Sequence, residues 1–391
     1  MNDRMRRLSQ RMSHISPFEV MEIQTLARQL EAEGKDVIHM EIGEPDFRTP
    51  EPIVEAAIKA LRDEPMLYTS ALGMKPLREA IAGFYETKYG VKVDASRIVV
   101  TAGSSAALLL TFAVLLNAGD EVLMADPGYP CNRHFVRTVD GVPVGIPVGP
   151  DTDYQLAAKH IAPHCSERTV ATLVASPANP TGTIVAPEEL ANIRNEVTRL
   201  GGTLVVDEIY QGLTYGVEPS TALTLGDDVF VINSFSKYFQ MTGWRLGWLV
   251  VPPAYVRTIE TLAQNLFISA SAPAQFAALA AFKPETIAIL EARRAELHAR
   301  RDFLIPALRK LGFGVPVVPQ GAFYIYADSS ALGPSSYDLS RRIMNEAHVA
   351  VTPGNDFGAN EPQKHIRIAY TRPIARLQEA MARIDRLGLR G

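Results

Sequence analysis

Five apolar runs in the first two thirds of the chain are each followed by small or polar residues that could bind a ligand. Ala102-Gly103-Ser104-Ser105 follows the first run and opens an apolar helical stretch. Small residues at such a turn let backbone N–H groups approach an anion, and the positive end of a helix dipole favours it. The turn therefore predicts a phosphate site, although it matches neither the dinucleotide fingerprint nor the P-loop.

The next three runs are followed by an aromatic ring, an amide and an acid. Tyr129 comes after the second run and could stack on a flat heterocycle or simply pack a loop. Asn179 follows the third run in a turn rich in Pro and Gly, and adds an amide donor. Asp207 ends the fourth run, with Tyr210 three residues later. A buried carboxylate there needs a cation or a strong donor, unless it only caps a helix.

A lysine follows the fifth run. Ser234-Phe235-Ser236-Lys237 comes directly after it, and Arg245 is close behind. Burial lowers the pKa of a lysine enough for it to act as an amine nucleophile, and an exposed loop lysine is the alternative. One ligand would use the anion site, the ring, the amide, the acid and the lysine together. That ligand is pyridoxal 5′-phosphate, which has a phosphate, an aromatic ring, a ring nitrogen and an aldehyde.

The elements that must position these residues form an α/β pattern. Continuous Val, Leu and Ile runs are typical of strands buried on both faces of a largely parallel sheet, whose carboxyl ends meet at one edge and bind ligands there. The expected strands are Arg97–Thr101, Glu121–Met124, Thr169–Ala175, Thr203–Val206, Val229–Ile232 and Leu246–Val251, with crossover helices that include Ser105–Leu116 and Pro187–Leu200.

A second pattern begins near residue 280 and predicts a smaller α+β unit. Its expected helices are Pro284–Leu311, Tyr337–Glu346 and Ile374–Leu387, and its expected strands are Ala322–Tyr326, Val349–Val351 and His365–Ala369. We therefore expect a large cofactor-binding domain over residues 50–280 and a small C-terminal domain over 281–391. Residues 1–49 hold one helix and an irregular segment, expected to belong to the small domain or to a dimer contact.

Composition excludes several classes of protein. A net charge of −4 and a pI of about 6.1 argue against nucleic-acid binding, and the longest apolar stretch is too short to span a membrane. Four arginines among the first eleven residues precede no apolar segment of the kind a secretion signal has, and two cysteines are too few for a disulfide framework. We expect a cytoplasmic protein. His160 and His164 lie beside Cys165, but Pro163 interrupts the helix that would align them, so no metal site is expected.

Six ordered motifs, which together span nearly the whole chain, resemble those of the class I and II aminotransferases, which are fold-type I pyridoxal-phosphate enzymes. The motifs are Gly43-Glu44-Pro45-Asp46, Tyr68 with Gly73 and Arg78, Asn179-Pro180-Thr181-Gly182, Asp207-Glu208-Ile209-Tyr210, Ser234-Phe235-Ser236-Lys237 with Gly243-Trp244-Arg245, and His365-Ile366-Arg367-Ile368. The resemblance implies the fold-type I architecture, pyridoxal phosphate as cofactor, and a homodimer with composite active sites.

The resemblance also implies a role for each matching residue. Lys237 would bind the cofactor aldehyde covalently and move the substrate proton, Asp207 would hold the ring nitrogen, and Tyr129 would stack on the ring. Tyr210 and Asn179 would hydrogen-bond the phenolic oxygen of the ring. The phosphate would be held by Gly103, Ser104, Ser105, Ser234, Ser236 and Arg245, with Tyr68 reaching the phosphate of the partner subunit. Arg367 would pair with the substrate carboxylate, beside Gly43 and Asn179.

The implied reaction is the ping-pong transfer of an amino group from an L-amino acid to a 2-oxo acid, with 2-oxoglutarate expected as the acceptor. Family members that take dicarboxylates have a lysine where this chain has Ser105, or a partner arginine from a region near residues 269–273. Residues 259–280 contain no Lys or Arg. We therefore expect a neutral or aromatic donor. Aspartate stays open, because Arg48 or an N-terminal arginine could supply the missing cation.

Other functions are open on the same residues. A carbon–sulfur β-lyase or a cyclising synthase would use the same cofactor site. A cofactor-sensing transcription regulator would need a DNA-binding domain before the motifs, where this chain has some 40 residues and one clear helix. A nicotinamide dehydrogenase lacks support because its glycine fingerprint is absent.

Overall fold

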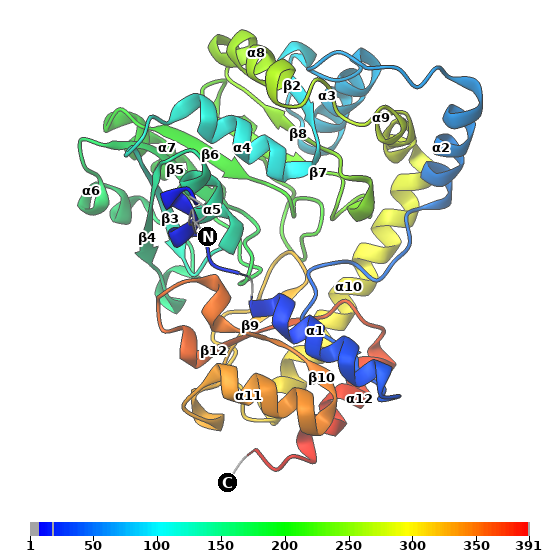
Figure 1. The fold of residues 1–391 in the computed structure, drawn as a ribbon, viewed down its shortest axis with the longest axis vertical. Helices are drawn as coiled ribbons and strands as arrows, with labels where there is room; N and C mark the ends of the chain where they lie inside the picture. Colours follow the sequence, from blue (N-terminus) through cyan, green and yellow to red (C-terminus); the bar gives the residue numbers. More distant parts are fainter. Residues whose placement is uncertain (1–7, 18, 390–391) are drawn as a thin grey trace, which may run out of the picture.

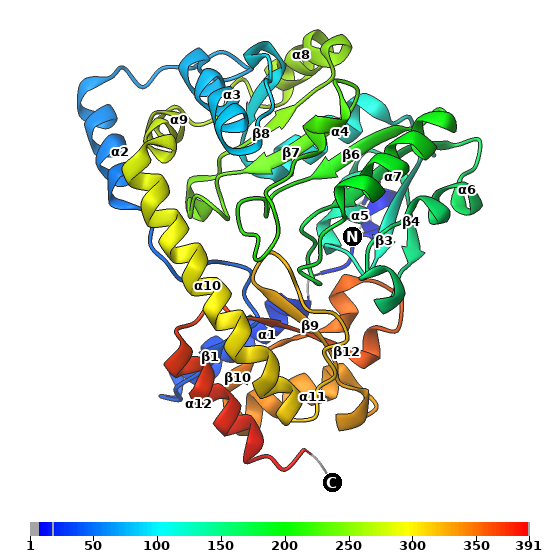
Figure 2. The ribbon, with the colours of Figure 1, turned by 180° about the vertical axis from the view of Figure 1, so that it is seen from behind.

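The computed structural model, which describes residues 8–17 and 19–389, places seven strands in one large sheet in the order β2-β8-β7-β6-β5-β3-β4. The strands β3 to β7 are parallel, and β8 is antiparallel to both of its neighbours. The expected α/β fold with a mostly parallel sheet is therefore confirmed. In Figures 1 and 2, which view the molecule from opposite sides, the large sheet and its helices form one half of the molecule and the remaining strands the other.

The elements have the following bounds. The strands are β1 (Ile38–His39), β2 (Ile98–Thr101), β3 (Glu121–Asp126), β4 (Val142–Pro147), β5 (Thr169–Ala175), β6 (Thr203–Asp207), β7 (Phe230–Ser234), β8 (Gly247–Val250), β9 (Tyr324–Asp328), β10 (Val349–Ala350), β11 (Thr352–Pro353) and β12 (His365–Ala369). The α-helices are α1 (Glu19–Ala32), α2 (Glu51–Asp63), α3 (Lys75–Tyr89), α4 (Gly103–Leu115), α5 (Pro130–Thr138), α6 (Ile161–His164), α7 (Pro187–Arg199), α8 (Val256–Leu266), α9 (Ala272–Ala278), α10 (Pro284–Lys310), α11 (Ser336–Arg342) and α12 (Ile374–Asp385).

The large sheet is buried on both faces, as its continuous apolar runs predict. Successive residues of a strand point to opposite faces, so Val205 packs in one hydrophobic cluster with the α4 residue Leu108, whereas Val206 packs in the other with the α7 residue Ile193. Helix α4 is apolar on nearly every side, which fits a helix packed between the sheet and α8. This double cover fixes the carboxyl ends of the strands at one edge.

One strand was missed, one expected helix is shorter than predicted, and several other element ends lie one or two residues from the expected positions. The edge strand β4 is absent from the expectation because Pro143, Gly145 and Pro147 are poor strand formers; an edge strand tolerates them, since β4 pairs only with β3. The helix expected over Tyr337–Glu346 ends as an α-helix at Arg342 and continues as a π-helical turn, Ile343–Ala347.

The remaining strands form two small sheets. β9, β12 and β11 make an antiparallel sheet, and β1 pairs in parallel with β10. The segment after α1 is therefore joined by backbone hydrogen bonds to strands from the end of the chain. The divisions at residues 49 and 280 stay predictions.

Helix α10 runs alongside both halves of the molecule (Figure 2). It spans 27 residues, and its buried Arg300 pairs with Asp46 at 2.8 Å between Nη1 and Oδ1. The long helix is thereby tied to the irregular segment that follows β1.

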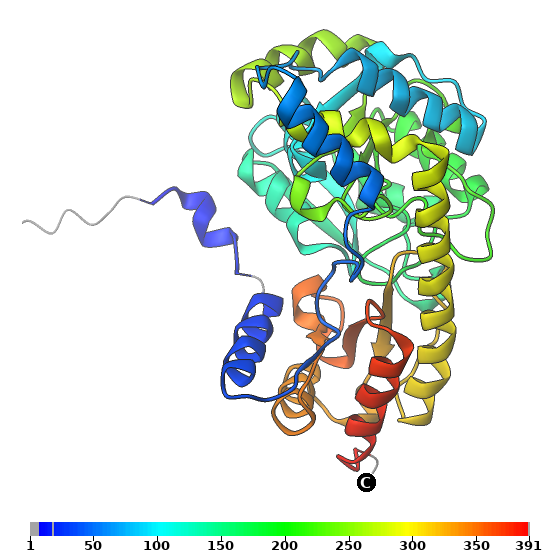
Figure 3. The ribbon, with the colours of Figure 1, turned by 90° about the vertical axis from the view of Figure 1, so that its right-hand side faces the viewer.

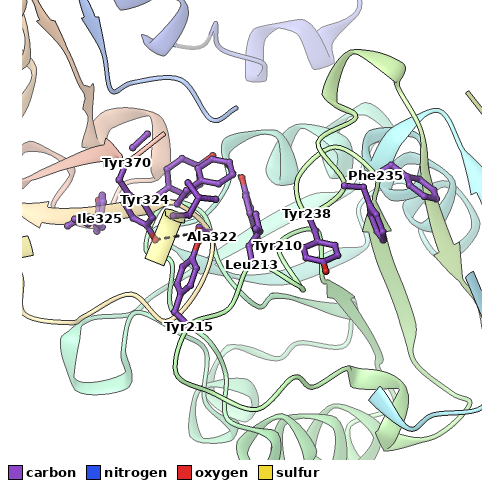
Figure 4. Close-up of a cluster of buried hydrophobic side chains, with 14 of the residues drawn as sticks. Tyr210, Leu213, Tyr215, Phe235, Tyr238, Ala322, Tyr324, Ile325 and Tyr370 are labelled. Carbon is purple, nitrogen blue, oxygen red and sulfur yellow. Dashed lines mark hydrogen bonds between the residues drawn. The ribbon is translucent and has the colours of Figure 1, made fainter. Parts of the chain in front are cut away.

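A cluster of aromatic side chains joins the segment after β6 to β9 (Figure 4). Tyr215 donates its hydroxyl hydrogen to the carbonyl of Ala322 at 2.6 Å, and the rings of Tyr210 and Tyr324 meet edge to face. Because every polar atom in these contacts has a partner, the cluster holds the small antiparallel sheet against the carboxyl edge of the large one.

The N-terminal arginines are described only in part. Arg4, Arg6 and Arg7 lie outside the described residues, whereas Arg11 pairs with Asp140 at 3.0 Å. Over residues 8–17 and 19–389, no helix is long and apolar enough to cross a bilayer, and no three His, Cys, Asp or Glu side chains are grouped as metal ligands would be.

Candidate active site

A cavity of about 440 Å³ opens where the carboxyl ends of β5 and β6 face β9, β12 and α1. Segments from most of the chain contribute to its wall. Eleven residues singled out in the sequence line it: Gly43, Ser104, Ser105, Tyr129, Asn179, Asp207, Tyr210, Ser236, Lys237, Arg245 and Arg367. The fold therefore gathers residues that lie up to 324 positions apart, from Gly43 to Arg367, around one space.

One end of the cavity is built for an anion. Ser104 and Ser105 lie in the first turn of α4, and Ser236 and Arg245 come from the segment after β7. Gly103 has a φ of +78°, and a Cβ atom there would lie 2.6 Å from Nη2 of Arg245. A glycine at this turn therefore leaves the space that the guanidinium occupies, and backbone N–H groups, hydroxyls and a cation converge as a phosphate requires.

A carboxylate lies at the floor of the cavity. Asp207 is the last residue of β6, is 4% exposed, and accepts a hydrogen bond from the backbone N–H of Ile209 at 3.1 Å. Burial raises the pKa of Asp207 to about 6, an increase that this hydrogen bond and the charge of Lys237 oppose. The helix-cap alternative does not hold, since no regular helix begins at Asp207.

The lysine is partly buried in the same cavity. Nζ of Lys237 donates to the carbonyl oxygen of Gly43 at 2.6 Å. Burial lowers the pKa of Lys237 to about 8; the carboxylate of Glu44 opposes this change, and Arg367 adds to it. With a pKa of about 8, about one tenth of this amine is uncharged at pH 7, far more than for a free lysine, and the uncharged form is the one that acts as a nucleophile or a base.

A buried arginine faces the lysine side of the cavity from β12. Arg367 is 5% exposed, and its guanidinium donates to Oδ1 of Asn179 at 3.0 Å and to the carbonyl oxygen of Glu41 at 2.5 Å. Its charge lies over two rings, 4.4 Å from the centroid of Tyr324 and 4.9 Å from that of Phe357. Its Nε has no partner within the described part of the chain, so the guanidinium retains donor capacity.

The sequence analysis missed Tyr324. This β9 residue lines the cavity, and its hydroxyl lies 2.8 Å from the hydroxyl of Tyr210. A Cβ atom on Gly43 would lie 2.3 Å from Oη of Tyr324, so this glycine is required by the close approach of the ring. The sequence does place Tyr324 in an expected strand that could pair with the strand of Arg367. It does not show which face of that strand meets the cavity.

The α1 wall was missed as well. Val20, Met21 and Gln24 line the cavity, as do Leu108 and Ile209. Helix α1 forms the outer boundary of the cavity and stands at the edge of the molecule in Figure 3. No chemical group in α1 marks it as part of a site, so only the fold could reveal this role.

Three of the singled-out residues do not line the cavity. Ser234 is 1% exposed, and its Oγ lies 2.9 Å from Oγ of Ser236, so it supports a lining residue from behind. Gly103 makes room for Arg245, as described above. Tyr68 is 81% exposed and lies in an exposed stretch before α3, where no described residue covers it.

A second cavity, of about 340 Å³, shares Tyr129, Ala175 and Asn179 with the first. The arginines Arg133 and Arg137 of α5 line it, and the guanidinium of Arg133 donates to the carbonyl of Asp356. Tyr129 is thus a wall between two spaces, and burial raises its pKa.

These features fit pyridoxal phosphate. The donor set at α4 and Arg245 suits its phosphate, and Gly103 leaves the room that the Arg245 guanidinium needs. Asp207 and Lys237 supply the acid and the amine that its ring nitrogen and aldehyde require. The donors and the acid belong to one cavity, as binding of a single molecule demands.

Comparisons with known proteins agree with this geometry. Residues 35–384 match the family model described as aminotransferase class I and II. The chain is 38% identical to a valine–pyruvate aminotransferase of Mycobacterium tuberculosis, over 95% of this chain and 96% of the relative. It is 34% identical to an aspartate aminotransferase of Streptomyces avermitilis, over 98% of this chain and 96% of that relative. A crystal structure of a Mycobacterium tuberculosis aminotransferase superposes with a TM-score of 0.94 at 36% identity, over 98% of this chain and 99% of the other. The structure of the aspartate aminotransferase of Thermus thermophilus with maleate superposes with a TM-score of 0.92 at 32% identity, over 98% of this chain and 100% of the other.

Proposed function

The chain belongs to the class I and II aminotransferases, which depend on pyridoxal phosphate, and from this premise we propose that it moves the amino group of a neutral or aromatic L-amino acid to a 2-oxo acid. The observation that carries the proposal is the charge of the cavity lining. Over the described residues, its cations are Lys237, Arg245 and Arg367, and each is committed to the cofactor or to the α-carboxylate. A side-chain carboxylate of the substrate would have no cation left.

The cofactor, when bound, supplies an aldehyde that takes the amino group and an electron-withdrawing ring that stabilises negative charge at the substrate Cα. In our proposal its phosphate is held by the start of α4 with Arg245 and Ser236, and Asp207 faces the ring nitrogen. Tyr129 covers the ring, and Tyr210 and Asn179 bind its phenolic oxygen. Ser234 holds Ser236 in place through the hydrogen bond between their hydroxyls.

Lys237 moves the proton in this scheme. Its uncharged Nζ would take the proton from Cα of the amino acid and return it to the carbon on the other side of the substrate nitrogen, acting first as a general base and then as a general acid. Arg367 binds the α-carboxylate, because its planar guanidinium matches that group in two parallel hydrogen bonds. The contact between Arg367 and Asn179 aligns the guanidinium before substrate arrives. Asp207 stays negatively charged opposite a cationic ring nitrogen.

The substrate side chain would face an apolar wall. Val20, Met21, Leu108 and Ile209 line the cavity, and Ser105 stands where some dicarboxylate enzymes carry a lysine. Arg48, the cation considered for aspartate, does not line the cavity. The mycobacterial relative is named for valine and pyruvate, which carry no side-chain charge. 2-Oxoglutarate remains the acceptor expected from the sequence, and the same lining favours pyruvate as its competitor.

Single-turnover spectroscopy tests the proposal. The holoenzyme is mixed with L-valine, L-alanine, L-phenylalanine or L-aspartate, and the loss of the absorbance of the oxidised cofactor is followed. We expect the neutral acids to react faster than aspartate, and the absorbance to return on adding pyruvate or 2-oxoglutarate. Equal or faster reaction with aspartate contradicts the substrate class, and no reaction with any amino acid contradicts the function.

A matched variant sharpens the substrate assignment. Ser105→Lys places a cation at the position that the resemblance marks, and Ser104→Lys places one a residue away. We expect Ser105→Lys to raise the rate with aspartate relative to valine, and Ser104→Lys to give no such gain. A β-lyase, the alternative function, would instead release ammonia and a 2-oxo acid from a cysteine conjugate without any acceptor.

The active unit is proposed to be a homodimer. Tyr68 is exposed and lies next to the exposed Leu67 and Met66. An apolar exposed stretch of this kind is typical of a surface buried by association. Sedimentation of the holoenzyme should show a dimer, and Tyr68→Phe should weaken cofactor binding without changing the mass.

A further inference from the structure

His39 lies between two carboxylates from different parts of the fold. Its Nδ1 is 2.8 Å from Oε1 of Glu41, and its Nε2 is 3.1 Å from Oε1 of Glu31. Glu41 is fully buried, Glu31 is about half exposed on α1, and the imidazole is largely covered. Ionised carboxylates only accept hydrogen bonds, so when both glutamates are ionised both ring nitrogens must donate, which is the doubly protonated imidazolium.

The buried member of this trio adjoins the substrate arginine. The backbone carbonyl of Glu41 accepts hydrogen bonds from Arg367 at 2.5 Å and from Oγ1 of Thr352 at 3.1 Å. Oε2 of Glu41 has no partner in the described part of the chain. The charge of the His39 ring is therefore the counterion that makes the burial of this carboxylate possible.

The exposed member adjoins the cavity wall through its helix. Glu31 lies in the last turn of α1, whose first turns contribute Val20, Met21 and Gln24 to the cavity. The opposite end of α1 is held where Asp356 accepts the backbone N–H of Val20 at 2.8 Å. His39 thus joins one end of the α1 wall to the strand that leads to Gly43.

We propose that His39 is a pH-dependent latch that holds α1 against the substrate side of the cavity. Below the pKa of His39 the imidazolium bonds both carboxylates. Above it one ring nitrogen keeps only a lone pair, and that nitrogen repels the carboxylate it faces. The contact with Glu31 is the one lost, because Glu31 can turn to water whereas Glu41 cannot. Helix α1 then loosens, and the substrate is held less firmly.

The surroundings of His39 favour its protonated form. Hydrogen bonds and charge from Glu41 and Glu31 raise the pKa of His39, against the opposing effect of burial. The paired strand β10 contributes only Val349 and Ala350. The turn before α12 contributes Arg372, whose Nε donates to the His39 carbonyl at 3.0 Å, and Asp36 nearby along the chain is already paired with Arg376 and Arg383. Since the pKa is raised, the latch is closed at low pH and opens as pH rises through that value.

Hydrogen exchange and kinetics of the holoenzyme test the latch. We expect exchange of the α1 amides, corrected for the intrinsic effect of pH, to speed up by about three- to tenfold between about pH 6 and about pH 9. The KM for the amino acid in the half-reaction should rise over the same range with kcat little changed. The pH midpoint of the His39 ring titration, measured by NMR, should equal the pH midpoint of the change in α1 exchange.

Two variants decide between the latch and a purely structural role. Glu31→Gln replaces an acceptor-only group with an amide that can also donate to a neutral imidazole, so it should remove the pH step in α1 exchange. Glu33→Gln changes an exposed neighbour whose side chain has no hydrogen-bond or ion-pair partner among the described residues, and it should keep the step. A step that persists in Glu31→Gln, or α1 exchange that does not respond to pH, overturns the proposal. Only the KM measurement rests on the proposed function. If the protein does not transaminate, the hydrogen-exchange and NMR results still test the latch.

Discussion

The two ends of the active-site cavity are assembled in different ways. The end proposed to hold the cofactor is made by the turns after successive strands of one sheet, with Asp207 after β6 and Lys237 after β7. The end proposed to hold the substrate is made by Gly43, Tyr324 and Arg367, which belong to segments that meet only in the folded chain. Parallel strands bring their carboxyl ends to one edge by topology alone, so the first end is fixed by one sheet. The second depends on how separate sheets pack.

Exchanging the lysine for alanine tests the cofactor end with the largest expected effect. Lys237→Ala removes the amine that forms the covalent link and moves the proton, so turnover should fall by about 10⁴-fold or more. The measurement is steady-state transamination with valine and pyruvate. Lys92→Ala, at an 85% exposed lysine, should be unchanged. Near-normal turnover by Lys237→Ala would contradict the whole assignment of this end.

Arg367→Gln tests the substrate end. It removes the charge proposed to bind the α-carboxylate and replaces five N–H donors by the two of an amide, so kcat/KM for the amino acid should fall by about 10²-fold. Cofactor binding should be nearly unchanged, which separates the two ends. Arg257→Gln, on an 80% exposed side chain of α8, is the control. Loss of cofactor affinity as large as the loss of kcat/KM would show that the ends are not separable.

The pH dependence of cofactor capture probes the amine directly. Because burial lowers the pKa of Lys237 to about 8, the reactive uncharged form is complete above that value and falls about tenfold per pH unit below it. The rate of covalent capture of pyridoxal phosphate by the cofactor-free enzyme should follow this curve. A midpoint near the pKa of a free lysine would mean that the cavity does not desolvate the amine.

Tyr324→Phe should have the smallest effect on kcat/KM. It tests whether the Tyr324 hydroxyl links the cofactor end to the substrate end. It keeps the ring under Arg367 but removes the hydroxyl that lies 2.8 Å from that of Tyr210. We expect kcat/KM to fall about two- to tenfold, with a shift in the pH midpoint of the cofactor absorbance. Tyr255→Phe, whose ring packs on Phe230 away from the cavity, provides the comparison. An unchanged pH midpoint of the cofactor absorbance would show that Tyr324 acts on the substrate end alone.

The contrast between the ends also explains what could be predicted from the sequence. Asp207 and Lys237 were found because each directly follows a strongly apolar run, and such runs identify buried strands with little ambiguity. Arg367 was singled out through a resemblance in its flanking residues. Tyr324 and the α1 wall were missed, because periodicity gives the existence of a strand or helix and not the partner against which each face packs.

The edge strand β4 and the latch histidine were missed for related reasons. Pro143 and Gly145 argue against a strand unless it is known to lie at an edge, which only the assembled sheet tells. His39 is an ordinary histidine in the sequence, and its two carboxylate partners lie 8 positions before it and 2 after it without a recognisable spacing. Its role depends on the hydrogen bond between the Glu41 carbonyl and Arg367, a contact between residues more than 300 positions apart.

The long helix α10 has a mechanical consequence. At 1.5 Å per residue its 27 residues form a rod of roughly 40 Å that lies along both halves of the molecule. A rod resists stretching, so the two halves can change their mutual angle far more easily than their separation. Through the pairing of Arg300 with Asp46, a small bend of the rod is passed to the segment that carries Gly43. Any change in the angle between the two halves would therefore also move Gly43 in the wall of the cavity.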